Sequence, residues 1–202
     1  MAGSSPLDRY FHLGNQLVAK YGRTVDMDVY NVTYDATGSR ELVAKNIQMR
    51  IDPAGARTQA LPAFPGVNYF VVFGPKNLLK AGHLLIPSKS DGFTPAVTII
   101  QNVPTSDVTA IRTGQVGQIT DGTDLLYDNV YYDFYTFQGP EGMVEPEFIG
   151  STRMETNKAI IFYRPEILID HQFILSSGKR FQIVTNNTIG NQTSLMLRRE
   201  PR

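Results

Sequence analysis

The sequence predicts a mainly β fold, in which an N-terminal amphipathic helix precedes antiparallel β-barrel or β-sandwich units. Apolar residues recur at helical spacing near the N-terminus, alternation of apolar and polar residues begins at Thr24, and a set of strand-like segments recurs 90 residues later. The 202 residues suffice for one large domain or two small ones. We expect a first unit over 1–104 and a second over 105–202, which could also make one continuous domain.

The helix is predicted to begin near Ser5 and to end at Gly22. Ser5 and Pro6 suit the N-cap and the first helical position, and Gly22 suits the left-handed residue that follows a helix. The apolar stripe consists of Leu7, Tyr10, Phe11, Leu17, Val18 and Tyr21. The opposite face is not basic, so we expect the helix to cover a sheet rather than to anchor the chain to a membrane.

A β-hairpin is predicted directly after the helix. Val25, Met27 and Val29 alternate with polar residues, the segment 34–38 supplies a turn, and the residues from Val43 to Ile51 alternate again. The segment 52–66 then contains three prolines and two glycines, which excludes a helix or a central strand. This long loop either reaches a neighbouring subunit or is a simple connector.

Further strands are predicted in both halves of the chain. They cover 68–73, 83–86, 96–100, 159–163, 173–175, 181–184 and 194–197. Between them, the segment 107–147 combines eight acidic residues with a single base, Arg112, and with six tyrosines or phenylalanines between 127 and 137. We interpret it as an acidic aromatic insertion in the second unit and as a contact surface.

The second half of the chain echoes part of the first. Residues 71–79 align with residues 161–169, and the register continues through Leu85 over Leu175 and Lys89 over Lys179. Each copy reads as a strand, a turn that begins with proline, a strand, a polar hairpin and a strand. Duplication of a small antiparallel unit accounts for this pattern, and chance similarity between two β-rich segments is the alternative.

Composition excludes several classes of function. Basic and acidic residues number 19 each, so no overall field attracts nucleic acid or anionic membrane. Cysteine is absent, which excludes disulfides and thiolate chemistry. No signal peptide and no stretch of about 18 apolar residues occurs, so we expect a soluble protein made inside the cell and without a membrane partner.

No motif for catalysis, metal or cofactor binding assembles in the sequence. The three histidines have no second histidine or cysteine at metal-ligand spacing. The segment 176–180 lacks the first glycine and the Ser or Thr of a phosphate-binding loop, and 121–124 lacks the order of an EF-hand. We therefore expect no enzymatic activity, no metal and no cofactor.

The helix that ends in 17–23, the strand that begins at Thr24-Val25 and the turn 34–38 together resemble the opening of head–tail joining proteins of tailed bacteriophages, the neck or head-closure family. Residues 177–181, Ser-Gly-Lys-Arg-Phe, are similar to that family's Gly-Lys-aromatic hairpin, although the Gly-Asp usual before it is absent. The resemblance implies a virion protein, made in the host cytoplasm, that forms a homo-oligomeric ring. It also implies portal or adaptor and tail proteins as partners, retention of packaged DNA and non-specific proximity to DNA in the channel.

Three pairs of residues are the candidate interface positions. They are Arg57 and Phe64 in the Pro-rich loop, Tyr131 and Phe134 in the acidic aromatic segment, and Arg198 and Arg199 in the basic tail. The tail could meet phosphate or the acidic segment of a neighbouring subunit. The alternatives to a neck protein are another virion structural protein, such as a tail terminator, baseplate or capsid decoration protein, and a β-barrel binding module that stacks ligands on exposed aromatic rings.

Overall fold

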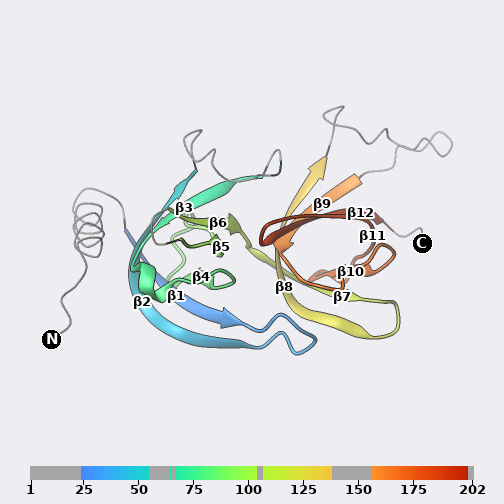
Figure 1. Ribbon diagram of the computed structural model, residues 1–202, viewed down its shortest axis with the longest axis horizontal. Helices are drawn as coiled ribbons and strands as arrows, with labels where there is room; N and C mark the ends of the chain where they lie inside the picture. Colours follow the sequence, from blue (N-terminus) through green and yellow to red (C-terminus); the bar gives the residue numbers. More distant parts are fainter. Residues whose placement is uncertain (1–23, 55–63, 65–66, 104–106, 138–155, 200–202) are drawn as a thin grey trace. The chain divides into compact units, whose positions relative to one another are not determined.

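A computed structural model of the chain describes residues 24–54, 64, 67–103, 107–137 and 156–199 (Figure 1). Its strands form two closed six-stranded antiparallel barrels, which confirms the mainly β fold. The first barrel contains β1 (Val25–Val32), β2 (Arg40–Pro53), β3 (Tyr69–Phe73), β4 (Leu84–Pro87), β5 (Val97–Gln101) and β6 (Val108–Arg112). The second contains β7 (Gln115–Thr120), β8 (Leu125–Phe137), β9 (Thr156–Phe162), β10 (Gln172–Leu175), β11 (Arg180–Ile189) and β12 (Gln192–Arg199). The helix expected within residues 5–22 lies outside the described residues.

The passage from the first unit to the second lies between Arg112 and Thr113, some residues beyond the boundary expected from the sequence. Among the described residues, the second unit also takes in Val32–Arg40, Phe64 and Val67. The segment that we interpreted as an insertion instead supplies β6, β7 and β8 as far as it is described, so it is part of both barrels. The turn of the β1–β2 hairpin therefore belongs to the second unit, while most of its strand residues belong to the first.

The two barrels share one topology. The strands of the first follow each other round the barrel as β1-β2-β3-β6-β5-β4, and those of the second as β7-β8-β9-β12-β11-β10. In each barrel the third strand thus pairs with the sixth, and the fourth pairs with the first. Closure leaves no free sheet edge in either barrel. The echo in the sequence falls on corresponding elements, since it relates β3 to β9 and β4 to β10.

Hydrogen bonds place the repeat in a slightly different register from the one seen in the sequence. Ile99 N donates to His83 O (2.9 Å), and Ile183 N donates in the same way to His171 O (2.8 Å). In both barrels the residue before the histidine has a positive φ, 92° and 78°, and its N–H donates to that same isoleucine. His83 therefore corresponds to His171, 88 rather than 90 positions later, because the second loop is two residues shorter.

An asparagine fastens this loop in each barrel. In the first barrel the loop contains the short helix η2 (Lys76–Leu78), and Asn102 Nδ2 donates to the carbonyls of Lys76 (3.0 Å) and Leu79. In the second barrel Asn186 Nδ2 donates to the carbonyl of Ile167. Leu79 and Ile167 are both buried in the cores of their own barrels. The repeat thus includes a core contact and its polar support as well as the strand order.

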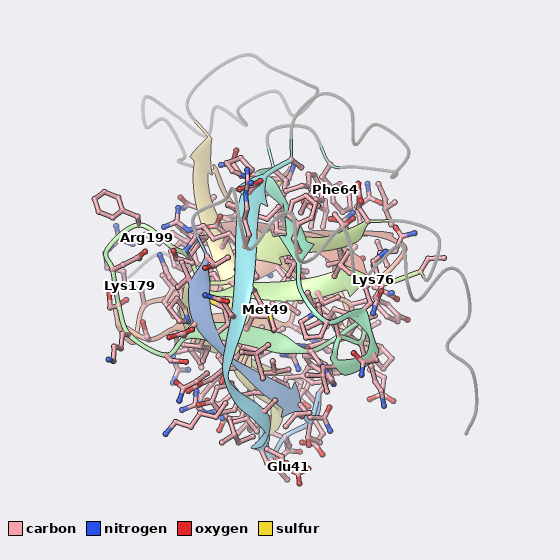
Figure 2. All side chains as sticks on the ribbon, turned by 90° about the vertical axis from the view of Figure 1, so that its left-hand side faces the viewer. Glu41, Met49, Phe64, Lys76, Lys179 and Arg199 are labelled. Atoms are coloured by element: carbon pink, nitrogen blue, oxygen red, sulfur yellow. The ribbon has the colours of Figure 1, made fainter. Side chains whose placement is uncertain are left out.

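A bulge in β2 changes which side chains of this strand face the core. We expected the residues from Val43 to Ile51 to alternate without interruption, with Val43 on the same face as Met49. Asn46 has a φ of 52°, and its N–H donates to Asp28 Oδ1 (2.9 Å). The alternation therefore shifts at Asn46: Met49, labelled on β2 in Figure 2, is buried, whereas Val43 is 44% exposed and Ala44 packs on the core.

Aromatic rings fill much of the core of the second barrel. Tyr132 on β8 packs edge-to-face on Phe173 of β10, with ring centroids 5.0 Å apart. Phe134 on β8 lies over Phe181 of β11 at 5.9 Å. The hydroxyl of Tyr132 is buried and has no hydrogen-bond partner within the described part of the chain. Burial raises the pKa of Tyr132 to about 12.

Replacing Tyr132 with phenylalanine is expected to raise the free energy of unfolding by about 1 kcal/mol, because it removes a buried hydroxyl that lacks a partner. Tyr127→Phe is the matched control: the Tyr127 hydroxyl donates to the carbonyl of Pro165, so its loss should lower the free energy of unfolding by about 1 kcal/mol. Urea denaturation at neutral pH, followed by circular dichroism, measures both changes. Destabilisation by Tyr132→Phe would contradict the expectation.

Candidate functional site

The turn 34–38 is rigidly built from its own side chains. Asp35 Oδ1 accepts hydrogen bonds from Thr37 N (2.8 Å), Thr37 Oγ1 (2.6 Å) and Gly38 N (3.2 Å). The bond from the Thr37 hydroxyl is the largest of the effects that lower the pKa of Asp35. Below the turn, Thr33 N donates to Ser39 O (2.8 Å) and closes the hairpin. This Asx-type turn explains why the sequence places aspartate and glycine three residues apart here.

The turn packs against a bulge in β8. Asp35 O accepts a hydrogen bond from Asp128 N (3.1 Å), and Gly38 O accepts one from Asn129 Nδ2 (2.8 Å). The pairing of β7 with β8 is irregular in this region, and Asn129 has a φ of 46°. A bulge redirects backbone groups out of the ladder, and here Asp128 N meets the turn instead of β7. Gln118 Nε2 supports the bulge through Asp128 Oδ1 (2.9 Å).

Gly38 is required at this contact by both conformation and space. Its φ is 52°, in the left-handed region that side chains other than glycine disfavour. A Cβ atom on Gly38 would lie 2.5 Å from the carbonyl carbon of Asp128. The backbone of the turn therefore approaches the backbone of β8 more closely than any other residue would permit.

A buried arginine lies beside the turn. Arg164 is the second residue after the end of β9. Its guanidinium lies 4.5 Å from the ring centroid of Tyr34 and 5.3 Å from that of Tyr127. Arg164 is only 2% exposed. Its Nη2 donates a long hydrogen bond to Asn129 O (3.5 Å), while Nε and Nη1 are buried and have no hydrogen-bond partner among the described residues. Tyr34 also stacks on Phe162, with centroids 4.7 Å apart.

Burial controls the protonation of this cluster. It lowers the pKa of Arg164 to about 10, against the favourable fields of Tyr34, Tyr127, Asp35 and Tyr131. The same burial raises the pKa of Tyr34 above its ordinary value. At neutral pH the cluster is thus one cation stacked between neutral phenols. Such an arrangement stabilises a docked turn.

The structure places the six candidate interface residues in different surroundings. Arg57 lies outside the described residues. Phe64 and Tyr131 are only 5% and 7% exposed, so neither side chain offers a contact surface in this conformation. Phe134 is half-buried and packs against the core of the second barrel. Phe134 faces the core of the barrel, whereas Tyr131 precedes the core residue Tyr132 on β8, points to the opposite face and lies near Tyr34 and Arg164.

The basic tail is exposed in part. Arg199 ends β12 opposite Phe181, and its side chain is exposed, whereas Arg198 is half-buried. Figure 2 labels Arg199 and the exposed Lys179 of the β10–β11 turn on the same side of the view. The structure therefore leaves Arg199 accessible, on β12 opposite Phe181, the residue on which Phe134 packs.

Three exposed apolar side chains were missed by the sequence reasoning. Phe93 is 81% exposed, Leu168 62% and Ile169 55%. The alignment at an offset of 90 residues paired Leu168 and Ile169 with Leu78 and Leu79, so they looked like core residues. The correct loop register, with His83 opposite His171, would have shown them opposite Lys80 and Ala81.

No family model, curated protein or solved structure matches this chain. Among the described residues no helix has the length and apolar character needed to cross a membrane. The same residues contain no group of three or more His, Asp or Glu side chains arranged to hold a metal ion.

Proposed function

We propose that this protein is a structural virion protein of a tailed bacteriophage, which forms a ring in the neck between head and tail and helps to retain packaged DNA. The observation that carries the proposal is the segment 17–38, whose helix-like, strand and turn pattern resembles the head–tail joining family. In the described part of that segment the chain forms β1 and the turn 34–38. The function would reside in contacts between subunits rather than in chemistry.

Two further observations support an assembly role. The turn 34–38 is held by its own hydrogen bonds, and Arg164 stacks on the ring of Tyr34 within it. In addition, three large apolar side chains are more than half exposed on loops of both barrels. Apolar side chains exposed in this way are available for burial against another subunit.

Cryo-electron microscopy of particles from the source lysate tests the proposal, together with quantitative mass spectrometry of the copy number per particle. We expect a ring of about 6 to 12 copies at a single vertex, closed by one repeated rotational contact. The copy number of the major capsid protein in the same sample is the internal standard. A neck ring further predicts that particles lacking the protein contain no DNA or no tail.

Other results would each select a different conclusion. Hundreds of copies per particle would contradict the neck and indicate a decoration or tail protein. Absence of the protein from purified particles would overturn the virion proposal as a whole. In that case a binding module becomes the leading hypothesis, and the isolated monomer should then bind a carbohydrate or a nucleic acid.

A further inference from the structure

Four basic side chains lie at one end of the strand pair β11–β12, which we call the cationic end. Lys179 and Arg180 stand where the turn after β10 enters β11. Arg198 and Arg199 end β12, and Arg199 lies opposite Phe181, the residue that follows Arg180. Lys179, Arg180 and Arg199 are exposed, and Arg198 is half-buried. A chain with equal numbers of basic and acidic residues thus concentrates four cations within a few positions of two adjacent strands.

Two of these cations point to the outside of the second barrel. Phe181 and Leu197 belong to the core of that barrel, and neighbouring residues of a strand point to opposite faces. Arg180 and Arg198 therefore face outward, at diagonal positions of adjacent strands. Like charges this close repel each other. The arrangement costs stability unless a negatively charged group neutralises it.

The described part of the chain does not supply that neutralisation. No described acidic side chain forms an ion pair with any of the three exposed cations. Asp121 follows β7 and Asp170 precedes β10, so both lie at the end of β10 away from the cationic end. The Oδ1 of Asp170 also accepts a hydrogen bond from Gln182 Nε2 (2.9 Å). The cationic end therefore keeps a local excess of positive charge.

The repeated fold does not require these cations. The hydrogen-bonded isoleucines that align the two barrels also align the strands around them, so residues 95–96 correspond to 179–180. On the next strand, residues 111–112 correspond to 198–199. The first barrel has Pro-Ala and Ile-Arg at these positions, so it closes with one cation where the second barrel has four. The other three are additions of the second barrel.

The groups at the cationic end suit phosphate rather than bases. The turn between β10 and β11 adds two exposed serines, Ser176 and Ser177, and is closed by a hydrogen bond from Gly178 N to Leu175 O (2.8 Å). Arginine, lysine and serine side chains are the usual contacts of nucleic-acid phosphates. The aromatic ring at this end, Phe181, is buried, so it offers no surface on which a base can stack.

An acidic segment of a neighbouring copy is the other partner that the sequence left open for the basic tail. In the described part of the segment 107–137, Asp121 Oδ1 accepts hydrogen bonds from two N–H groups of its own turn. Asp128 Oδ1 accepts them from Gln118 Nε2 (2.9 Å) and Asn129 N (2.8 Å). Both carboxylates therefore already have partners within the second unit, which favours phosphate as the group that the cationic end binds.

We propose that the cationic end of the second barrel binds the phosphate backbone of double-stranded DNA. This inference rests on the proposed function, because packaged DNA is the polyanion that a neck protein meets. The contact is independent of base sequence and sensitive to salt. With about four phosphates neutralised, the logarithm of the binding constant should fall against the logarithm of salt concentration with a slope of about −3.5. Binding should thus weaken about a hundredfold between about 50 and about 200 mM salt.

Fluorescence anisotropy of a labelled DNA duplex of mixed sequence, titrated with the full chain, tests the contact. The triple variant Lys179→Gln, Arg180→Gln and Arg199→Gln removes the three exposed cations. We expect it to bind at least about tenfold more weakly than the unchanged protein at about 50 mM salt, with a salt slope smaller by about 2.7.

A matched control removes the same amount of charge from the first barrel. It carries Lys45→Gln, Lys80→Gln and Lys89→Gln, all at exposed positions. This variant should bind the duplex with nearly the affinity and the salt slope of the unchanged protein. Thermal unfolding followed by circular dichroism verifies that both triple variants are folded.

Three results would overturn the proposal. They are no binding by the unchanged protein at low salt, equal losses in the two triple variants, and competition by polyglutamate as effective as that by unlabelled duplex. The last result would assign the cationic end to an acidic protein segment. The copy number per particle tests the neck function separately: a neck ring whose chain binds no duplex overturns only this contact, and duplex binding by a chain absent from particles overturns only the neck.

Discussion

Replacing Gly38 with alanine is expected to lower the free energy of unfolding of the second unit by about 3 kcal/mol or more. The added Cβ would lie 2.5 Å from the carbonyl carbon of Asp128, and the φ of 52° is itself unfavourable for alanine. The turn must move away from β8 to relieve the overlap. That movement stretches the hydrogen bonds of Asp35 O with Asp128 N and of Gly38 O with Asn129 Nδ2.

Gly190→Ala is the matched control for this substitution. Gly190 has a φ of 59° and belongs to the same unit, but a Cβ there would meet no atom within 4 Å. Gly190→Ala should therefore lower the free energy of unfolding only through the unfavourable positive φ, by about 1 to 2 kcal/mol. Urea unfolding measures both variants, and hydrogen exchange of the Asp128 amide reports the docking locally. Equal costs for the two substitutions, with unchanged exchange at Asp128, would show that the turn does not need this close approach.

The strands were predictable from the sequence because a strand with one buried face alternates apolar and polar residues with a period of two. In β1 the alternation of Met27 and Val29 with polar residues fixes both the strand and its buried face. In β2 the same reasoning gave the strand but the wrong face for Val43. The left-handed conformation of Asn46 interrupts the pleat. Asparagine adopts this conformation more readily than most residues, but the acceptor of its N–H, Asp28 Oδ1, lies on another strand, which a local pattern does not show.

The candidate site was predictable only in its local part. Asp35 and Gly38 predict a turn, because an aspartate side chain bonds to backbone N–H groups two and three residues later and glycine permits a positive φ. That the turn belongs to the second unit depends on Asp128 and Arg164, which lie about 90 and 130 positions later. The sequence pattern around Arg164 indicated a turn after a strand and gave no sign of a buried cation. The surroundings of the aromatic candidates likewise depend on residues far along the chain: Phe134 packs on Phe181 of β11, and Tyr131 lies near Tyr34 and Arg164.

Two substitutions of Arg164 distinguish the effect of its buried charge on the free energy of unfolding from the effect of its side-chain volume. Burial lowers the pKa of Arg164 from the ordinary arginine value to about 10, which corresponds to about 3 kcal/mol against the charged form. Stacking on the rings of Tyr34 and Tyr127 stabilises the charged form by about 2 kcal/mol. Arg164→Met keeps most of the volume and removes the charge, so we expect it to raise the free energy of unfolding by about 1 kcal/mol. Arg164→Ala leaves a cavity between the rings and should lower it by about 3 kcal/mol.

The pH dependence follows from the same pKa. Between the folded pKa of about 10 and the higher ordinary pKa of arginine, the unfolded chain binds the proton of Arg164 and the folded chain does not, so this group makes folding more favourable as pH rises. The advantage of Arg164→Met over the unchanged protein should thus be constant from pH 7 to 9 and shrink above pH 10. Paired urea titrations at each pH measure this difference, in which the titrating groups that do not interact with Arg164 cancel; the pKa values of Tyr34, Tyr127 and Asp35 depend on the Arg164 charge. If Arg164→Met instead destabilises the protein at pH 7, then Nε and Nη1 hold a partner, such as a buried water or anion, whose bonds outweigh the cost of the charge.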